Sequence, residues 1–317
     1  MRVLITGSNG FIGRHLCQRL SHEQGIQTLG IDISEHKHSA CNSPAGVAAL
    51  AFVRRDICDR QSLALDFEFF QPHVVMHLAA RLGVKNVMEN PGTTISENVL
   101  GTVNVVELAQ SYGAHVFFAS TSDVYGHSKD LPFKEDGYSV IGPAHEPRWS
   151  YAISKLAGEH LTQATNGTIL RFFNVTGPGQ DTHYVLPYFV TEALKGHQLT
   201  VYGNGQQTRC FTDVRDVVNV LMDFIDNVDN EEIAGEIYNI GSRNEITMLD
   251  LAFMVNKAIR ENPETISVAH ISPPHLYTEM PRRKPDMSKV EELLGWIPEI
   301  SLEKTIQDTA RYWRQLL

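Results

Sequence analysis

The chain opens with Arg2-Val3-Leu4-Ile5-Thr6-Gly7-Ser8-Asn9-Gly10-Phe11-Ile12-Gly13, the stretch that decides the fold. The apolar run predicts a buried strand, and Phe11–Leu20 carries helical periodicity. The glycines between them allow a tight turn, close approach to a pyrophosphate and close packing of the helix on the sheet. The helix N-terminus adds unpaired N–H groups for the phosphate. We therefore expect a dinucleotide to contact Gly7, Asn9, Gly10, Phe11, Ile12 and Gly13.

Asp32 ends the next predicted strand, nineteen residues after Gly13. An acidic side chain at this place hydrogen-bonds the ribose diol of NAD and repels the 2′-phosphate of NADP. No arginine follows at once, since the next residues are Ile33-Ser34-Glu35. The sequence therefore favours NAD as the cofactor.

Short apolar runs alternate with helical patterns along the first half of the chain. Such alternation predicts an α/β fold with a doubly wound parallel sheet, the Rossmann arrangement. We expect an NAD-binding domain over residues 1–174, with some later segments, around 210–242, returning to it. A smaller substrate-binding domain is expected over residues 175–317. The predicted elements include strands at Thr28–Asp32, Ala51–Arg54, Val74–Ala79 and His115–Ser120, and helices at Ser62–Phe70, Glu97–Tyr112 and Tyr151 to about Thr165.

Composition excludes several classes of function. The 317 residues are 42% hydrophobic and 20% charged, with a formal net charge of −10, and they show no basic stripe for a nucleic acid. No apolar run approaches the ~18 residues of a membrane span. Four cysteines (Cys17, Cys41, Cys58, Cys210) have no metal-ligand spacing, and fourteen histidines are scattered. We expect free thiols, a cytoplasmic protein and no metal site.

The candidate chemistry lies in Ser150-Tyr151-Ala152-Ile153-Ser154-Lys155, which follows a hydroxyl-rich segment at Ser120-Thr121-Ser122-Asp123. A free tyrosine has a pKa near ~10, which is too high for a base at neutral pH. Lys155 lies four residues after Tyr151, hence on the same helix face, and its ammonium favours the phenolate. Tyr151 would then take a proton from a sugar hydroxyl that Thr121 hydrogen-bonds, while NAD takes the hydride.

In these motifs the chain resembles an extended short-chain dehydrogenase/reductase, and more narrowly the NAD-dependent nucleotide-sugar epimerase/dehydratase family. The resemblance covers nearly the whole chain. Further motifs that carry it are Asp56-Ile57, His77-Leu78-Ala79-Ala80, Asn98, Ser120-Thr121-Ser122-Asp123-Val124-Tyr125-Gly126, Arg171-Phe172-Phe173-Asn174-Val175, Thr208-Arg209 and Arg282-Arg283-Lys284-Pro285-Asp286.

The resemblance implies roles that spacing alone does not give. By it, Asp56 and Ile57 would hold the adenine, and Asn98 would help order the nicotinamide side. Lys155 would also bind the nicotinamide ribose. The strand end under the cofactor would be Leu78, Ala79 and Ala80, and the substrate diphosphate would meet Asn174, Arg209 and either Arg282 or Arg283. Family members usually dimerise through a four-helix bundle, so we expect a homodimer formed by the helices Glu97–Tyr112 and Tyr151–Thr165.

Removal of a proton and a hydride from the C4 hydroxyl would give a 4-keto sugar, and the sequence allows more than one reaction after that step. Thr121 is followed by Ser122 and Asp123, whereas the UDP-glucuronate decarboxylases that the chain resembles carry Thr-Ser-Glu. Asp123 either acts at C5 of the sugar or only shapes its loop. We favour a UDP-sugar 4-epimerase narrowly, with UDP-glucuronate decarboxylation next and 4,6-dehydration third. A net reductase or a non-catalytic NAD-binding regulator are the rivals, and the intact Thr121, Tyr151 and Lys155 set disfavours the regulator.

Overall fold

The structure is a computed structural model, and it describes residues 1–35, 50–260, 268–271 and 280–317. Cys41 therefore lies outside the described residues. The chain divides into two compact units. Unit 1 comprises Met1–Val124, Pro143–Arg171 and Val218–Tyr238, and unit 2 comprises Tyr125–Gly142, Phe172–Val217 and Asn239–Leu317.

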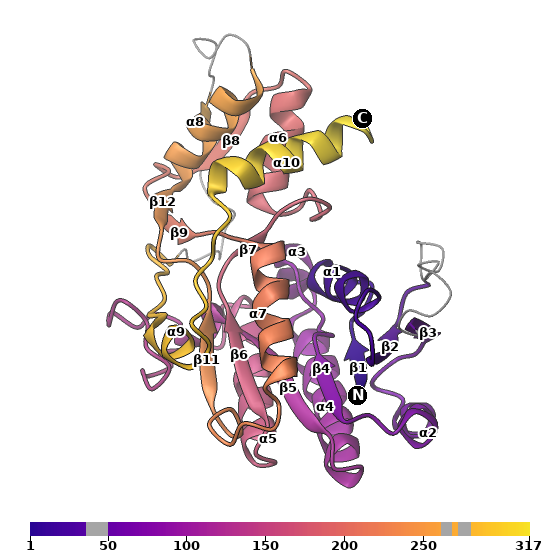
Figure 1. Cartoon of the computed structure of the whole chain (residues 1–317). Coiled ribbons are helices and arrows are strands. Elements are labelled where there is room, and N and C mark those ends of the chain that lie inside the picture. The colour runs from indigo at the N-terminus through magenta and orange to yellow at the C-terminus, as the bar shows by residue number, and fades with distance from the viewer. Residues whose placement is uncertain (36–49, 261–267, 272–279) are drawn as a thin grey trace. The chain divides into compact units, whose positions relative to one another are not determined.

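A seven-stranded sheet has the order β11-β6-β5-β4-β1-β2-β3, and all of it lies in unit 1 except the last residues of β6 and β11 (Figure 1). Strand β1 pairs in parallel with both β2 and β4, so the strand order reverses beside β1. A ligand crevice belongs at the carboxyl ends of the strands at such a reversal. The prediction of a doubly wound α/β fold is confirmed. The strands are β1 (Arg2–Thr6), β2 (Gln27–Asp32), β3 (Leu50–Arg54), β4 (Val74–His77), β5 (His115–Thr121), β6 (Thr168–Phe172) and β11 (Ile237–Ile240).

Helices supply the apolar faces that bury this sheet. Leu63, Phe67 and Val105 are fully buried in one cluster with residues of the strands. The helix predicted from Glu97 begins six residues earlier, because Pro91 stands in its first turn, where proline is well tolerated. The helical elements are α1 (Phe11–Leu20), α2 (Arg60–Phe70), α3 (Val84–Glu89), α4 (Pro91–Ser111), α5 (Trp149–Gln163), the short 3₁₀ helix η1 (Ser122–Tyr125) and α7 (Val214–Asp226), which begins in unit 2 and continues in unit 1.

Unit 2 has its own core, in which Phe189, Leu251 and Ile306 are fully or almost fully buried on three different helices. The strands described in this unit pair in twos: β10 with β7, β12 with β9 and β13 with β8. The elements are β7 (Val175–Thr176), α6 (Val185–Leu194), β8 (Leu199–Tyr202), β9 (Thr208–Cys210), β10 (Thr212–Asp213), β12 (Glu245–Thr247), α8 (Met248–Ile259), β13 (Val268–Ile271), α9 (Ser288–Leu294) and α10 (Leu302–Arg314).

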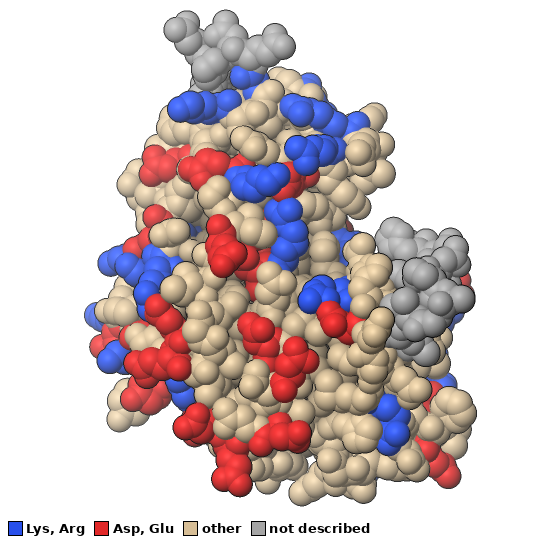
Figure 2. Space-filling model, viewed as in Figure 1, with Lys and Arg blue, Asp and Glu red and all other residues tan. Residues whose placement is uncertain are grey.

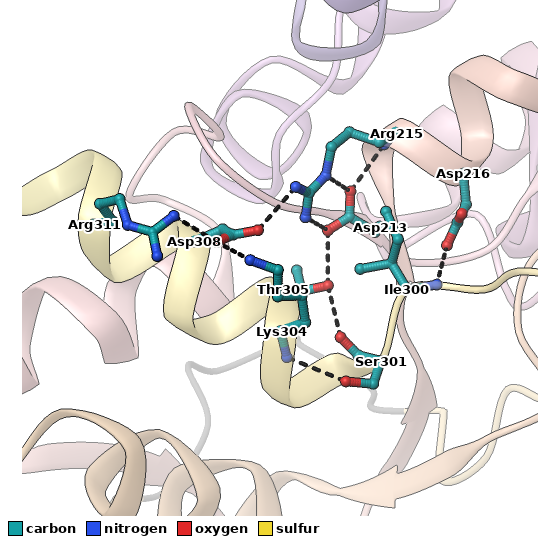
Figure 3. Close-up of polar contacts among 9 residues, drawn as sticks. All are labelled: Asp213, Arg215, Asp216, Ile300, Ser301, Lys304, Thr305, Asp308 and Arg311. Atoms are coloured by element: carbon teal, nitrogen blue, oxygen red, sulfur yellow. Dashed lines mark hydrogen bonds and ion pairs between the residues drawn. The ribbon is translucent and has the colours of Figure 1, made fainter.

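An ion-pair cluster fastens α10 within unit 2 (Figure 3). Arg215 donates to Asp213 on β10 and to Asp308 on α10, with the N–O distances all 2.8 Å. Lys304 and Arg311 donate to the second oxygen of Asp308 at 2.8 and 3.0 Å. The side chain of Asp213 is fully buried, and a buried carboxylate is costly without such a partner. The cluster therefore ties the last helix to the strand that pairs with β7.

The surface carries both signs of charge. On the face drawn in Figure 2, acidic and basic side chains of the described residues are interspersed. Within the described part of the chain, no helix is both long and apolar enough to cross a bilayer.

Candidate active site

The glycine turn is shaped by backbone crowding. Gly7 has φ +73°, and a Cβ there would lie 2.7 Å from the backbone nitrogen of Ala79. A Cβ on Gly13 would collide with the carbonyl oxygen of Gly7. The N–H groups of Gly7 and Ser8 donate to Ile31 at 2.8 and 3.2 Å, which fixes the turn against β2. Side chains are thus excluded from a cradle at the N-terminus of α1, as a bound pyrophosphate requires.

Asp32 is held beside this turn. One carboxylate oxygen accepts the backbone N–H of Asn9 at 2.9 Å, and the other accepts the N–H and hydroxyl of Ser34 at 2.9 and 2.7 Å. The Asn9 amide donates in turn to the Ser34 carbonyl at 3.0 Å. The structure therefore brings Asn9 and Asp32 together. The turn and the carboxylate fit the pyrophosphate and ribose of a dinucleotide.

The Asp56-Ile57 segment is tied to α4. The amide of Asn104 donates to the carbonyl of Ile57 at 2.9 Å and to that of Cys58 at 3.2 Å. Gly101 faces the Ile57 side chain so closely that a Cβ there would overlap it. Asp56 is exposed, and its carboxylate accepts the N–H of Cys58 at 2.9 Å. This segment is thus rigidly presented for the predicted adenine contact.

A buried polar chain runs under the end of β4. His77 lies between the hydroxyls of Thr6 and Thr102, at 2.7 and 3.1 Å, and the Thr6 hydroxyl also accepts the N–H of Ala79 at 3.3 Å. Burial, assisted by the charge of Lys155, lowers the pKa of His77 to about 3. A neutral imidazole therefore links β1, β4 and α4 just below the predicted cofactor strand end, Leu78-Ala79-Ala80.

Asn98 uses its side chain to join the segment after β4 to helix α5. Its oxygen accepts the N–H of Arg81 at 2.6 Å, and its NH₂ group donates to the Arg81 carbonyl at 3.1 Å and to the Ser154 hydroxyl at 2.9 Å. Ser154 donates to the carbonyl of Tyr151 at 2.8 Å. Asn98 therefore orders the segment after β4 and the start of α5 together.

The predicted catalytic residues all belong to unit 1. Thr121 ends β5, and its hydroxyl accepts the N–H of Asp123 on η1 at 3.2 Å. Tyr151 and Lys155 lie one turn apart on α5, which packs on β5. The ammonium of Lys155 donates to the Ala119 carbonyl at 2.7 Å and lies 4.7 Å from the centre of the Phe118 ring. Burial lowers the pKa of Lys155 to about 7, although the Glu159 carboxylate acts to raise it.

Sequence reasoning missed a buried ion pair next to this set. Glu159 follows Lys155 by four residues, and both of its oxygens accept from Arg171 on β6, at 2.9 and 2.8 Å. The hydroxyl of Ser120 donates to the same carboxylate at 2.5 Å. The signal was available, because Tyr151, Lys155 and Glu159 share one helix face by their spacing.

The four candidate residues for the diphosphate contact lie in unit 2. Arg209 is buried and donates to the carbonyls of Thr208 and Met280 at 2.6 and 3.0 Å. Arg282 is half-exposed, and its Nε and Nη2 donate to the two carboxylate oxygens of Glu245 at 2.8 and 2.6 Å. Arg283 is 9% exposed.

Asn174, which directly precedes β7, carries a buried side-chain oxygen. That oxygen has no hydrogen-bond partner in the structure, so it is available to a ligand group. Within the residues that the structure describes, no group of histidine, cysteine or acidic side chains is arranged to hold a metal ion.

A model of the NAD dependent epimerase/dehydratase family matches residues 3–241. The chain is 36% identical over 325 residues to a UDP-N-acetyl-alpha-D-glucosaminuronate decarboxylase of Bacillus cytotoxicus, covering 99% of this chain and 98% of that protein. It superposes with a TM-score of 0.86 and 26% identity on UDP-glucose 4-epimerase of Thermotoga maritima, covering 100% and 99% of the two chains. The chain also superposes on UDP-glucuronic acid 4-epimerase of Bacillus cereus, solved with UDP-glucuronic acid and NAD. This superposition has a TM-score of 0.85 and 27% identity, and it covers 100% of both chains.

Proposed function

The chain belongs to the NAD-dependent epimerase/dehydratase family, and on that premise we propose that it decarboxylates a UDP-linked hexuronate through a 4-keto intermediate. The observation that carries this proposal is the 36% identity over 99% of the chain to a UDP-N-acetylhexosaminuronate decarboxylase. The 4-epimerisation that the sequence favoured narrowly is the second candidate, and the likeness to two solved 4-epimerases supports it.

NAD, when bound, supplies the hydride acceptor for C4 of the sugar. We assign the cradle for its pyrophosphate to the turn from Gly7 to Gly13, and the ribose contact to Asp32. Lys155 lies on the same face as Tyr151 and stabilises the charge that the tyrosine oxygen gains. Tyr151 is the proposed general base, which takes the proton of the C4 hydroxyl while the Thr121 hydroxyl orients that group.

Loss of the carboxylate then follows from the chemistry of a ketone. The C4 carbonyl lies β to the C6 carboxylate, so the C5–C6 bond pair can move onto the C4 oxygen as CO₂ leaves. The hydroxyls of Thr121 and Tyr151 are the proposed donors to the resulting enolate oxygen. C5 then gains one proton in place of CO₂. Asp123, whose backbone is tied to Thr121, is the residue that we assign to guiding that proton.

The substrate diphosphate is assigned to Asn174, Arg209 and Arg283 of unit 2. The NH₂ group of Asn174 can donate to a diphosphate oxygen, and its unpartnered buried oxygen can accept from a hydroxyl of the sugar. Between the two neighbouring arginines we choose Arg283 because it is buried, whereas Arg282 is half-exposed and donates to both oxygens of Glu245. Buried guanidinium groups bind phosphates well, since they are weakly hydrated and present several donors at once.

The products separate the two candidates. Purified protein is incubated with UDP-glucuronate and, separately, with UDP-N-acetylglucosaminuronate. The products are identified by mass spectrometry. Loss of the mass of CO₂ supports decarboxylation. Unchanged mass with altered retention supports 4-epimerisation and contradicts the first proposal.

The role of Asp123 has its own test. We expect Asp123→Asn to form the 4-keto intermediate and lose CO₂ but to stall before C5 is protonated, which lowers product formation about tenfold or more, as for loss of a proton-transfer group. Asp130→Asn, an exposed carboxylate a few residues along, is the control. If Asp123→Asn turns over at the wild-type rate, Asp123 only shapes its loop.

We also propose a homodimer through α4 and α5. These two helices pack together, and Leu100 and Ile153 expose 49% and 39% of their surface on them. Light scattering at micromolar concentration tests this assembly. A monomeric mass would contradict it.

A further inference from the structure

A second layer of charged residues lies behind Lys155. The side chains of Glu159 and Arg171 are each only 5% exposed. Arg171 grips the Glu159 carboxylate with two nitrogens, and Ser120 donates to one of the same oxygens. A buried ion pair with this many hydrogen bonds is costly to disrupt, because removing one partner leaves a desolvated charge.

Strand β5 joins this layer to the catalytic set. Two consecutive residues of the strand contact α5: the Ala119 carbonyl accepts from Lys155, and the Ser120 hydroxyl donates to Glu159. The next residue, Thr121, ends the strand beside η1. Any shift of α5 along β5 would break the first two contacts together. The register of the Tyr151–Lys155 face is thus set by Ala119 and Ser120.

The charges around Lys155 come from several elements. Tyr151 and Glu159 share its helix, His77 lies on β4 and Arg171 on β6. Helix α4 meets this part of α5 with the uncharged amide of Asn98, through Ser154. His77 is fully buried and stays neutral near neutral pH, so Glu159 is the anion that faces the ammonium group.

We propose that Glu159, clamped by Arg171 and Ser120, is a positioning residue that holds Lys155 in place and in its ammonium form. The carboxylate attracts the ammonium across one helical turn, against the desolvation that burial imposes. Arg171 contacts both oxygens of the carboxylate and fixes its direction. The consequence for catalysis rests on the proposed role of Lys155, whereas the charge state of Lys155 does not.

Removing the negative charge of Glu159 and removing the positive charge of Arg171 should shift the titration midpoint of Lys155 in opposite directions. Glu159→Gln removes the anion one turn from Lys155 and keeps the Arg171 cation, and we expect the titration midpoint of the Lys155 ammonium to move to lower pH by about one pH unit or more. Arg171→Met leaves the bare carboxylate, and the midpoint should move to higher pH. The double variant Glu159→Gln/Arg171→Met should show a smaller downward shift. A purely structural role would move the two single variants in the same direction.

The experiment is an NMR titration of protein labelled with ¹³C at the lysine side chains, with Lys155→Arg used to identify the signal. Glu107→Gln/Arg60→Met makes the same change at an exposed pair of unit 1 and should leave the midpoint unchanged. If a single variant does not fold, the double variant still tests the proposal, because neutral replacement of both partners is often tolerated. Wild-type midpoints in every folded variant would overturn it.

Kinetics add a second measurement. Where the wild-type protein turns over a UDP-sugar, Glu159→Gln should lower kcat at neutral pH about tenfold, with KM little changed, as expected when proton transfer is impaired. The titration needs no substrate. Failure of the proposed reaction would therefore appear as an inactive wild-type protein, and failure of this inference as an unshifted Lys155 midpoint.

Discussion

His77 makes the stability of unit 1 depend on pH. The imidazole is completely buried between Thr6 and Thr102, and its folded-state pKa is about 3 against an ordinary value of 6.5. Above pH 6.5 both the folded and the unfolded chain carry neutral His77, so the group costs nothing. As the pH falls from 6.5 toward 3, only the unfolded chain takes up the proton, and the folded state loses stability.

The size of the loss follows from the difference between the two pKa values. One pKa unit corresponds to about 1.4 kcal/mol, so the full effect below pH 3 is roughly 5 kcal/mol. At pH 4.5 the unfolded chain is almost fully protonated at this site and the folded chain scarcely at all. The loss there is about 3 kcal/mol, a large fraction of the stability of an ordinary domain.

Urea unfolding followed by circular dichroism at pH 7.5 and pH 4.5 measures this effect. His77→Gln keeps a donor and an acceptor for the two threonines but cannot titrate. The wild-type protein should lose about 3 kcal/mol more than the variant between the two pH values. Equal losses in both proteins would refute the argument, because the other titrating groups are shared by the two chains.

Three further predictions concern the site. Tyr151→Phe should lower turnover about a hundredfold or more with an unchanged circular dichroism spectrum, and near wild-type turnover would remove Tyr151 from the mechanism. Gly13→Ala places a Cβ against the Gly7 carbonyl, so calorimetry should show NAD binding at least about tenfold weaker, and wild-type affinity would contradict the steric argument. Arg283→Ala should raise KM for the UDP-sugar more than Arg282→Ala does, and the reverse order would transfer the diphosphate contact to Arg282.

Much of the fold could be read from local signals. The apolar run before Gly7 and the periodicity of Phe11–Leu20 predict β1 and α1, whose described bounds agree within one residue. Apolar periodicity predicts the start of α4 at Glu97, six residues too late, because it gives Pro91 no weight as a start signal. Local pattern thus predicts which elements exist better than it predicts where they begin.

The surroundings of the candidate site could not be predicted in the same way. Glu159 and Arg171 are partners only because β6 lies next to β5 in the sheet, a fact of topology that no short motif contains. The difference between Arg282 and Arg283 likewise depends on Glu245, which is far away in the sequence. Contacts of this kind arise from long-range packing, so only the three-dimensional structure reveals them.

Oxidation at C4 followed by loss of CO₂ is tested most directly with a UDP-hexuronate that carries deuterium at C4. The product is analysed by mass spectrometry after full conversion in ordinary water. The predicted product is a UDP-pentose that is lighter than the substrate by the mass of CO₂ and retains deuterium at C4, because the hydride removed from C4 is the one returned to it. A product that keeps its carboxylate, or one that has exchanged the C4 deuterium for solvent hydrogen, would contradict the proposed reaction.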